Sequence, residues 1–137
     1  MHQLRPADVS VNSLRGNKDY DNGGSLIAEA PGNFTDTDSF EPRDEVKGDL
    51  ARMMFYMDVR YNGQGNTGTE DLQLVDYTGT SGASLGDLCT LYEWHLEDPV
   101  SPQEVARHAR IVERQGNRNP FVDNPAWVTE VWGAYCN

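Results

Sequence analysis

The sequence predicts an α+β fold in which helices predominate. Segments with apolar residues three or four positions apart outnumber the short alternating runs typical of strands. The chain has 137 residues, which is enough to bury one hydrophobic core. No internal repeat or linker is visible. We therefore expect residues 1–137 to form a single domain.

The longest helical pattern runs from Pro42 to Tyr61. Proline is favoured in the first turn of a helix, and the apolar residues of this segment fall on one stripe. That stripe consists of Val46, Leu50, Met53, Met54, Met57 and Tyr61. We expect this helix to lie at the centre of the core, and its methionines to fill the core rather than to form a binding surface.

Three further helices follow from their capping residues. One is expected from Ser84 to about Leu96, with Ser84 and Asp87 placed as caps. The next begins with the capping box Ser101–Glu104, has proline at its first position, and ends at Gly116. A last short helix is expected after Pro125, capped by Asn124. Its aromatic residues are expected to pack rather than to stack on bases.

Two short strands are expected in the polar segments between the helices. One lies near Leu26–Ala28, before the turn residues Pro31–Asn33. The other lies within Leu72–Tyr77, in a loop rich in glycine, threonine and asparagine. Long loops are therefore expected on both sides of the central helix.

The net charge of −11 is unevenly distributed along the chain. Residues 19–100 carry 17 acidic and 4 basic side chains, whereas seven of the eleven bases lie in residues 1–18 and 101–137. If those two segments meet, a positive groove can form on an acidic body. The alternative is that the acidic surface promotes solubility and the arginines are solvated.

Cysteine and histidine usage leaves two questions open. Cys89 and Cys136 either form a disulfide in an oxidising compartment or remain free thiols. The three histidines are widely separated and show no zinc-ligand spacing. No run of about 18 apolar residues is present, so no membrane partner is expected, and the N-terminus has no signal-peptide pattern.

The first eighteen residues contain a candidate metal ligand. An extended piece is expected to end at Pro6, and Asp8 can cap a short helix that is closed by Gly16. Asn12 lies about one turn into that helix, where asparagine is mildly unfavourable. Its amide oxygen is a hard, neutral ligand that suits Mg²⁺. The alternative is that Asn12 forms only a local hydrogen bond.

Three blocks of sequence match a known pattern. The first is Met1–Pro6, followed by Val11-Asn12 and Arg15-Gly16-Asn17. The second is Val46–Met57, and the third comprises Arg110-Ile111 and Gln115–Val122. In this order, the three blocks resemble the bacterial endonuclease I family, whose members carry a ββα-metal (His-Me finger) motif. The resemblance implies a partial ββα-metal motif, with its second strand and its helix packed on a helical core.

The resemblance further implies cleavage of DNA, and of RNA in some members, with little sequence preference. Asn12 corresponds to the metal ligand on the motif helix, and Mg²⁺ or another divalent cation is the implied cofactor. Basic side chains are candidates for contacts with phosphate groups, which position a backbone without reading bases. These candidates are Arg5, Arg15, Lys18 and Arg118. For each of them, an ion pair or a solvated position is the alternative.

The sequence departs from the family at the general base. The family has a Glu-His pair on the first strand of the motif, expected before Met1, and this dipeptide does not occur in the chain. We therefore expect an N-terminally truncated member, whose signal peptide belongs to the same missing part. His2 corresponds to a histidine of the second strand and is a candidate replacement base. The resemblance implies a secreted or periplasmic protein.

Three functional hypotheses follow. The first is a metal-dependent, sequence-nonspecific endonuclease whose activity is impaired by the missing pair. The second is a noncatalytic remnant that binds nucleic acid or ions, and the third is an acidic structural module. Neither the preference between DNA and RNA nor the oligomeric state can be predicted from the sequence.

Overall fold

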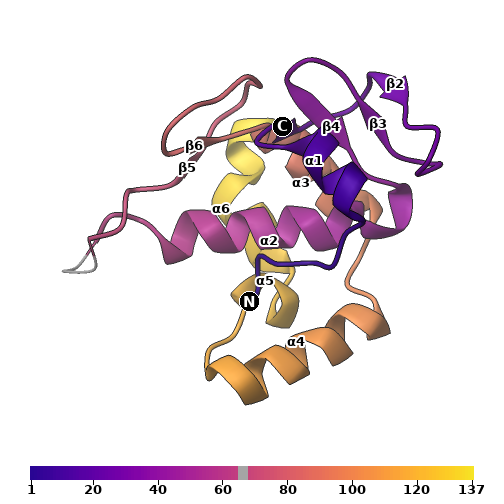
Figure 1. Cartoon of the computed structure of the whole chain (residues 1–137). Coiled ribbons are helices and arrows are strands. Elements are labelled where there is room, and N and C mark those ends of the chain that lie inside the picture. Colours follow the sequence, from indigo (N-terminus) through magenta and orange to yellow (C-terminus); the bar gives the residue numbers. More distant parts are fainter. Residues whose placement is uncertain (65–67) are drawn as a thin grey trace.

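The computed structural model describes residues 1–64 and 68–137, and it confirms a predominantly helical α+β fold (Figure 1). The helices are α1 (Val9–Arg15), the 3₁₀ turn η1 (Asp44–Val46), α2 (Lys47–Arg60), α3 (Leu88–Glu97), α4 (Pro102–Gln115), α5 (Pro120–Asp123) and α6 (Ala126–Cys136). The strands are β1 (Asp19–Tyr20), β2 (Ser25–Leu26), β3 (Phe34–Thr35), β4 (Ser39–Glu41), β5 (Gln73–Leu74) and β6 (Ser84–Leu85).

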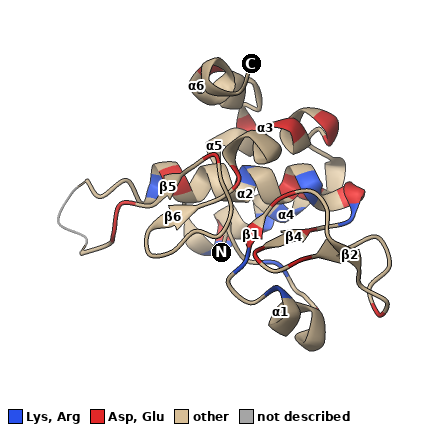
Figure 2. Ribbon diagram, turned by 90° about the horizontal axis from the view of Figure 1, so that it is seen from above, with Lys and Arg blue, Asp and Glu red and all other residues tan. Residues whose placement is uncertain are grey.

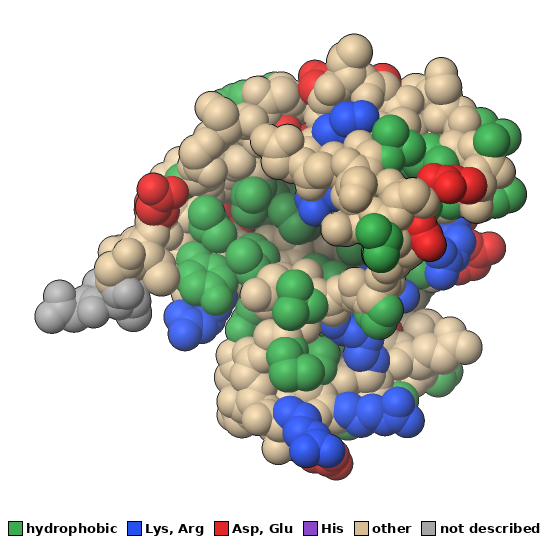
Figure 3. Space-filling view, viewed as in Figure 1, with side chains coloured by type: hydrophobic (Ala, Val, Ile, Leu, Met, Phe, Trp, Pro, Cys, Tyr) green, Lys and Arg blue, Asp and Glu red, His purple; other side chains and the backbone are tan. Residues whose placement is uncertain are grey.

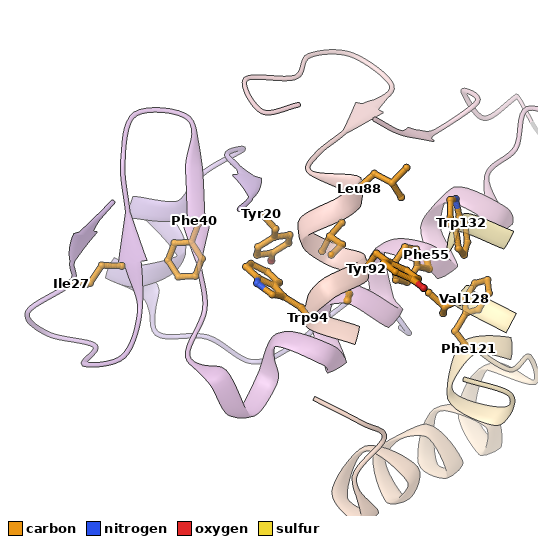
Figure 4. Packing of buried hydrophobic residues seen from close by; sticks show 12 residues of the cluster. Tyr20, Ile27, Phe40, Phe55, Leu88, Tyr92, Trp94, Phe121, Val128 and Trp132 are labelled. Atoms are coloured by element: carbon orange, nitrogen blue, oxygen red, sulfur yellow. The ribbon is translucent and has the colours of Figure 1, made fainter. Parts of the chain in front are cut away.

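Helix α2 lies across the middle of the molecule, as expected for a core helix (Figure 1). It packs mainly against α3, which in turn packs against α6. Aromatic and aliphatic side chains fill the space between them, and the ring centroids of Phe55 and Trp132 lie 4.5 Å apart (Figure 4). Trp94, Leu91 and Val128 are completely buried in the same core. The apolar pattern therefore predicted the correct central element but not its buried face. Ala51 and Phe55, which are not on the predicted stripe, lie in the main core, whereas Met57 and Tyr61 are only partly buried.

The start of α2 was predicted five residues too early. Residues 39–41 form β4, which pairs in parallel with β1 and antiparallel with β3. A 3₁₀ turn then precedes Lys47. Because pairing with two strands satisfies the backbone of Ser39–Glu41, the helix begins only after Pro42.

Helix α3 also begins later than predicted. Ser84 and Leu85 form β6 and pair with β5, so Asp87 is the N-cap and accepts from the amide of Thr90 at 3.0 Å. Helix α4 agrees with its capping signals at both ends. Ser101 accepts from the amide of Glu104 at 3.1 Å, and Gly116 ends the helix at φ 79°.

The C-terminal region differs from the prediction in two respects. A short helix, α5, was not predicted, and it is capped by Asn119, which accepts from the amide of Phe121 at 3.0 Å. Helix α6 begins at Ala126 after Pro125, but the side chain of Asn124 does not cap it. The disulfide between Cys89 and Cys136, left open by the sequence, forms and joins α3 to α6, with Cα atoms 5.2 Å apart.

The segment Met1–Pro6 does not form the expected strand. No described segment pairs with it through a ladder of backbone hydrogen bonds, and a strand needs such a partner. Arg107 of α4 holds this segment instead, donating to the carbonyl oxygens of Met1 and Leu4. Among residues 1–64 and 68–137, no helix is long and apolar enough to cross a membrane.

Candidate phosphate-binding groove

The helix that carries the candidate metal ligand is defined by strong caps. The carboxylate of Asp8 accepts from the amides of Ser10 and Val11 at 2.8 and 3.3 Å, and Gly16 ends the helix at φ 57°. Such an N-cap stabilises a helix by about 1 kcal/mol. The caps fix the short helix α1 although it buries none of its own residues. Asn12 lies in its middle, as predicted.

A groove of about 410 Å³ separates α1 from the N-terminal segment and the region around η1. Its lining includes three of the six predicted site residues, Arg5, Asn12 and Arg15. Figure 3 shows this face hollowed near its middle, with basic side chains around the hollow and over α4 below it. Acidic positions are spread over α2, α3 and the connecting loops (Figure 2).

Asn12 has a side chain that is free to take a ligand. It is exposed, and its amide forms no hydrogen bond with any of the described residues. The neighbouring amide Asn33 differs, since it donates to the carbonyl of Ala30 and accepts from the amide of Arg43. Asn12 therefore offers an available amide oxygen in this groove, as does Gln3, which also lines it and whose side chain bonds to none of the described residues.

Arg15 is a cation without an acidic partner in the described part of the chain. Its guanidinium lies over the ring of Tyr20, 4.7 Å from the ring centroid. Its Nε is buried and has no hydrogen-bond partner. A buried donor left unsatisfied costs about 1–3 kcal/mol. An anionic oxygen in the groove is the natural partner for such a donor.

The other predicted phosphate contacts are engaged within the protein. Arg5 lines the groove but forms an ion pair with Asp49. Lys18 donates to the hydroxyl of Thr35 at 2.8 Å and to the carbonyl of Asp36 at 2.5 Å. Lys18 and Arg15 both line a smaller adjoining pocket of about 250 Å³.

Arg118 lies outside both hollows and binds the carboxylate of Asp123 through two hydrogen bonds of 2.6 Å. Those bonds lower the pKa of Asp123 and raise that of Arg118. A bidentate pair of this kind occupies the same nitrogen atoms that a phosphate would need. The structure therefore does not bring Arg118 to the groove.

His2 lies in the interior rather than in the groove. Its side chain is buried, its Nε2 is 3.0 Å from the carbonyl oxygen of Asn117, and its ring packs between Tyr56 and His108. Burial lowers its pKa. This buried position does not favour His2 as the base that takes a proton from water at a substrate.

Two basic residues were missed by sequence reasoning. Arg43 lines the groove and is largely exposed, and its nearest carboxylate oxygen, on Glu45, is 3.6 Å away. Arg107 connects α4 to the N-terminal segment. The charge distribution contained a signal for Arg107, because it placed most of the bases in two segments that form a positive groove if they meet.

The fit of a metal ion to these residues is partial. The described residues contain no group of three histidine, cysteine or acidic side chains that could hold a metal. Asn12 offers one oxygen, and one turn earlier Asp8 uses an oxygen of its carboxylate for the cap. Mg²⁺ commonly takes one or two protein oxygens and completes its shell with water and substrate phosphate. Asn12 suits that pattern as a single ligand.

A sequence model of the family described as Endonuclease I matches residues 1–126. This chain belongs to the Endonuclease I family. It is 56% identical over 134 residues to an extracellular ribonuclease of Bacillus amyloliquefaciens, and 55% identical over 134 residues to one of Bacillus subtilis (strain 168). Each comparison covers 96% of this chain and 46% of the relative. The chain thus spans about half the length of these relatives.

Proposed function

We propose that the groove beside α1 is the metal- and phosphate-binding part of a nuclease that hydrolyses phosphodiester bonds in RNA, and also in DNA. The observation that carries this proposal is the pairing of two free groups in one groove. The side-chain amide of Asn12 has no hydrogen-bond partner, and the guanidinium of Arg15 has no carboxylate partner, among the described residues. Together they offer a ligand for a cation and a donor to an anion.

In this mechanism Asn12 would hold Mg²⁺ through its side-chain oxygen. When bound, the metal neutralises charge on the scissile phosphate and stabilises the leaving oxygen. Arg15 donates to a phosphate oxygen, and its contact with Tyr20 fixes the direction of the guanidinium. Arg43 adds positive charge to the same groove. All of these contacts are to the backbone, which accounts for cleavage with little sequence preference.

The step that removes a proton from water is not assigned to a residue of this chain. The Glu-His pair implied by the resemblance does not occur in the sequence, and His2 is buried. The burial of His2 supports a second candidate function, in which the groove binds nucleic acid without cleaving it.

We propose RNA as the main substrate, ahead of DNA, because both relatives are described as ribonucleases. Secretion is part of the proposal for two reasons. The same relatives are described as extracellular, and the disulfide between Cys89 and Cys136 is typical of an oxidising compartment. The expected partner is a nucleic-acid strand.

The test compares cleavage of RNA and of plasmid DNA by the wild type and by Asn12→Ala, with Mg²⁺ or with a chelator. Mg²⁺-dependent cleavage that is lost in Asn12→Ala supports the proposal. Ser13→Ala is the matched control, because Ser13 is exposed on the same helix and bonds only to the carbonyl of Val9. Cleavage retained by Asn12→Ala contradicts the metal role. Salt-dependent binding without cleavage supports the second function. If the protein neither binds nor cleaves nucleic acid, the acidic structural module is the hypothesis that remains.

A further inference from the structure

The basic side chains divide into two groups according to their partners. In residues 1–64 and 68–137, five bases form ion pairs: Arg5, Arg43, Lys47, Arg52 and Arg118. The other six have no carboxylate within 4.0 Å in the same residues: Arg15, Lys18, Arg60, Arg107, Arg110 and Arg114. The chain has 22 acidic and 11 basic residues, so an acidic neighbour is easy to find. A base without a carboxylate partner is therefore a candidate to bind an anion from outside the chain.

Three of these six bases, all of them arginines, face one groove. A hollow of about 750 Å³ lies between the N-terminal segment and α4, and its lining includes Arg107, Arg110 and Arg114. One acidic residue, Glu113, is among its lining residues. Because a helix rises about 1.5 Å per residue, these arginines extend over about 10 Å along α4. Their positive charges are therefore spread along the axis of α4 rather than concentrated at one position.

The three arginines have different structural roles. Arg107 is half-buried and holds the carbonyl oxygens of Met1 and Leu4, so it builds the wall of the groove. Arg110 and Arg114 are exposed and form no hydrogen bond or ion pair with the described residues. They are consequently free to contact a ligand, although they lie one turn apart and repel each other.

This groove lies beside the groove next to α1, on the other side of the N-terminal segment. Leu4 and Pro6 line both hollows, so the N-terminal segment is their shared wall. The space-filling view shows blue side chains both around the central hollow and over α4 at the bottom (Figure 3). A strand bound beside Asn12 can therefore pass over this segment to α4.

The lining also indicates the form of the ligand. Met1 and Leu4 are 52% and 63% exposed in the groove, and Pro6 and Ile111 complete its apolar part. A single strand presents the apolar faces of its bases together with its phosphates, whereas a duplex keeps its bases inside. Arginine guanidinium groups bind phosphates and also stack on bases.

We propose that the α4 groove binds the part of a single-stranded RNA that extends beyond the scissile phosphate, with Arg110 and Arg114 contacting its backbone. This inference rests on the proposed function, because it extends the same substrate path. It follows from two free arginines on a groove that shares the wall formed by Leu4 and Pro6 with the groove of Asn12. The proposed role of these arginines is binding and positioning, and they take no part in bond breaking.

The experiment measures binding of fluorescent single-stranded RNA by anisotropy in a chelator, over a range of salt concentrations. Oligonucleotides of four and of twelve nucleotides are compared for the wild type, Arg110→Ala and Arg114→Ala. Each variant should lower the salt slope by about 0.7 for the longer RNA, which is the value for one phosphate contact on a single strand. The shorter RNA should be unaffected, because it does not reach α4. Arg60→Ala is the matched control, since Arg60 is exposed, lacks a carboxylate partner and lines neither groove.

Several outcomes overturn the inference. If both variants bind the longer RNA with the wild-type slope, the α4 groove is not on the substrate path, while a loss of cleavage in Asn12→Ala would leave the proposed function intact. An equal loss of slope for duplex RNA contradicts the single-strand assignment. If the wild type binds no nucleic acid, the inference and the proposed function both fail. Circular dichroism melting confirms that the variants are folded.

Discussion

Replacing Glu104 by Gln tests the buried ion pair that holds the two sides of the site together. Arg52 is completely buried, and its Nε and Nη2 donate to the carboxylate of Glu104 at 2.8 and 2.6 Å. Its Nη1 donates to the carbonyl of Asp98 at 2.9 Å. These bonds connect α2 to α4 and to the end of α3. The substitution keeps the shape of the side chain and removes its charge.

The expected loss follows from what remains around Arg52. Removing one partner of a buried pair leaves an uncompensated charge and typically costs 3–5 kcal/mol. Asp49 lies 3.6 Å from the same guanidinium and compensates part of the charge. We therefore expect a loss near the lower end, about 3 kcal/mol in the free energy of unfolding. Because Asp49 also pairs with Arg5, the N-terminal wall of the groove should loosen as well.

Urea unfolding of the wild type and of Glu104→Gln measures this loss. The double variant Arg52→Met/Glu104→Leu is the control, because replacing the whole pair by apolar residues is often neutral or stabilising. The double variant should be more stable than the single one. A loss below about 1 kcal/mol in Glu104→Gln would refute the argument, since that is the size of an exposed ion pair.

The remaining predictions concern stability. Burial and the nearby guanidinium lower the pKa of His95 from 6.5 to about 4, so the unfolded chain takes up a proton first as the pH falls below 6.5. Between pH 7 and 5 this residue should lower the free energy of unfolding by about 2 kcal/mol, and His95→Gln should flatten that part of the pH profile measured by urea unfolding. Reduction of the disulfide between Cys89 and Cys136, which are 47 residues apart, should cost about 4 kcal/mol, measured by denaturation with and without a reductant; an unchanged midpoint would contradict this. Gly48→Ala should lower the melting temperature, because the added Cβ would overlap the carbonyl of Asp98; an unchanged melting temperature would show that the helix can shift.

Local capping chemistry predicted the elements that it controls. Asp8 and Gly16 set the bounds of α1, and Ser101 and Gly116 set those of α4. A cap depends only on residues within about one helical turn, so the local sequence is sufficient to predict it. The caps Asp8 and Gly16 also placed Asn12 about one turn into a short helix, and the structure agrees with that placement.

Tertiary contacts decided what local signals did not contain. The start of α2 moved because Ser39–Glu41 pairs with two other strands, and Ser84 pairs with β5 rather than capping a helix. The side chain of Glu104 reaches Arg52, which is 52 residues away, instead of the backbone amide that a capping box would satisfy. Such pairings depend on the position of distant residues.

The same limit applies to the candidate site. From the sequence, Arg15, Lys18 and Arg118 were equivalent candidates for phosphate contacts. The structure separates them by their partners, because Arg118 binds Asp123 and Lys18 binds the loop at Thr35, whereas Arg15 has no carboxylate partner in the described residues. A residue type predicts a capacity to bind phosphate, and only its neighbours show whether that capacity is already in use.

The most direct measurement of the central claim is nuclear magnetic resonance of the labelled chain during titration with Mg²⁺ and a short RNA. The account predicts that the side-chain amide of Asn12 shifts with Mg²⁺ and that the Nε–H of Arg15 shifts with RNA, while the exposed acidic residues of α3 and α6 do not respond to RNA. Shifts confined to regions away from this groove, or no shift at either side chain at saturating ligand, would contradict the account.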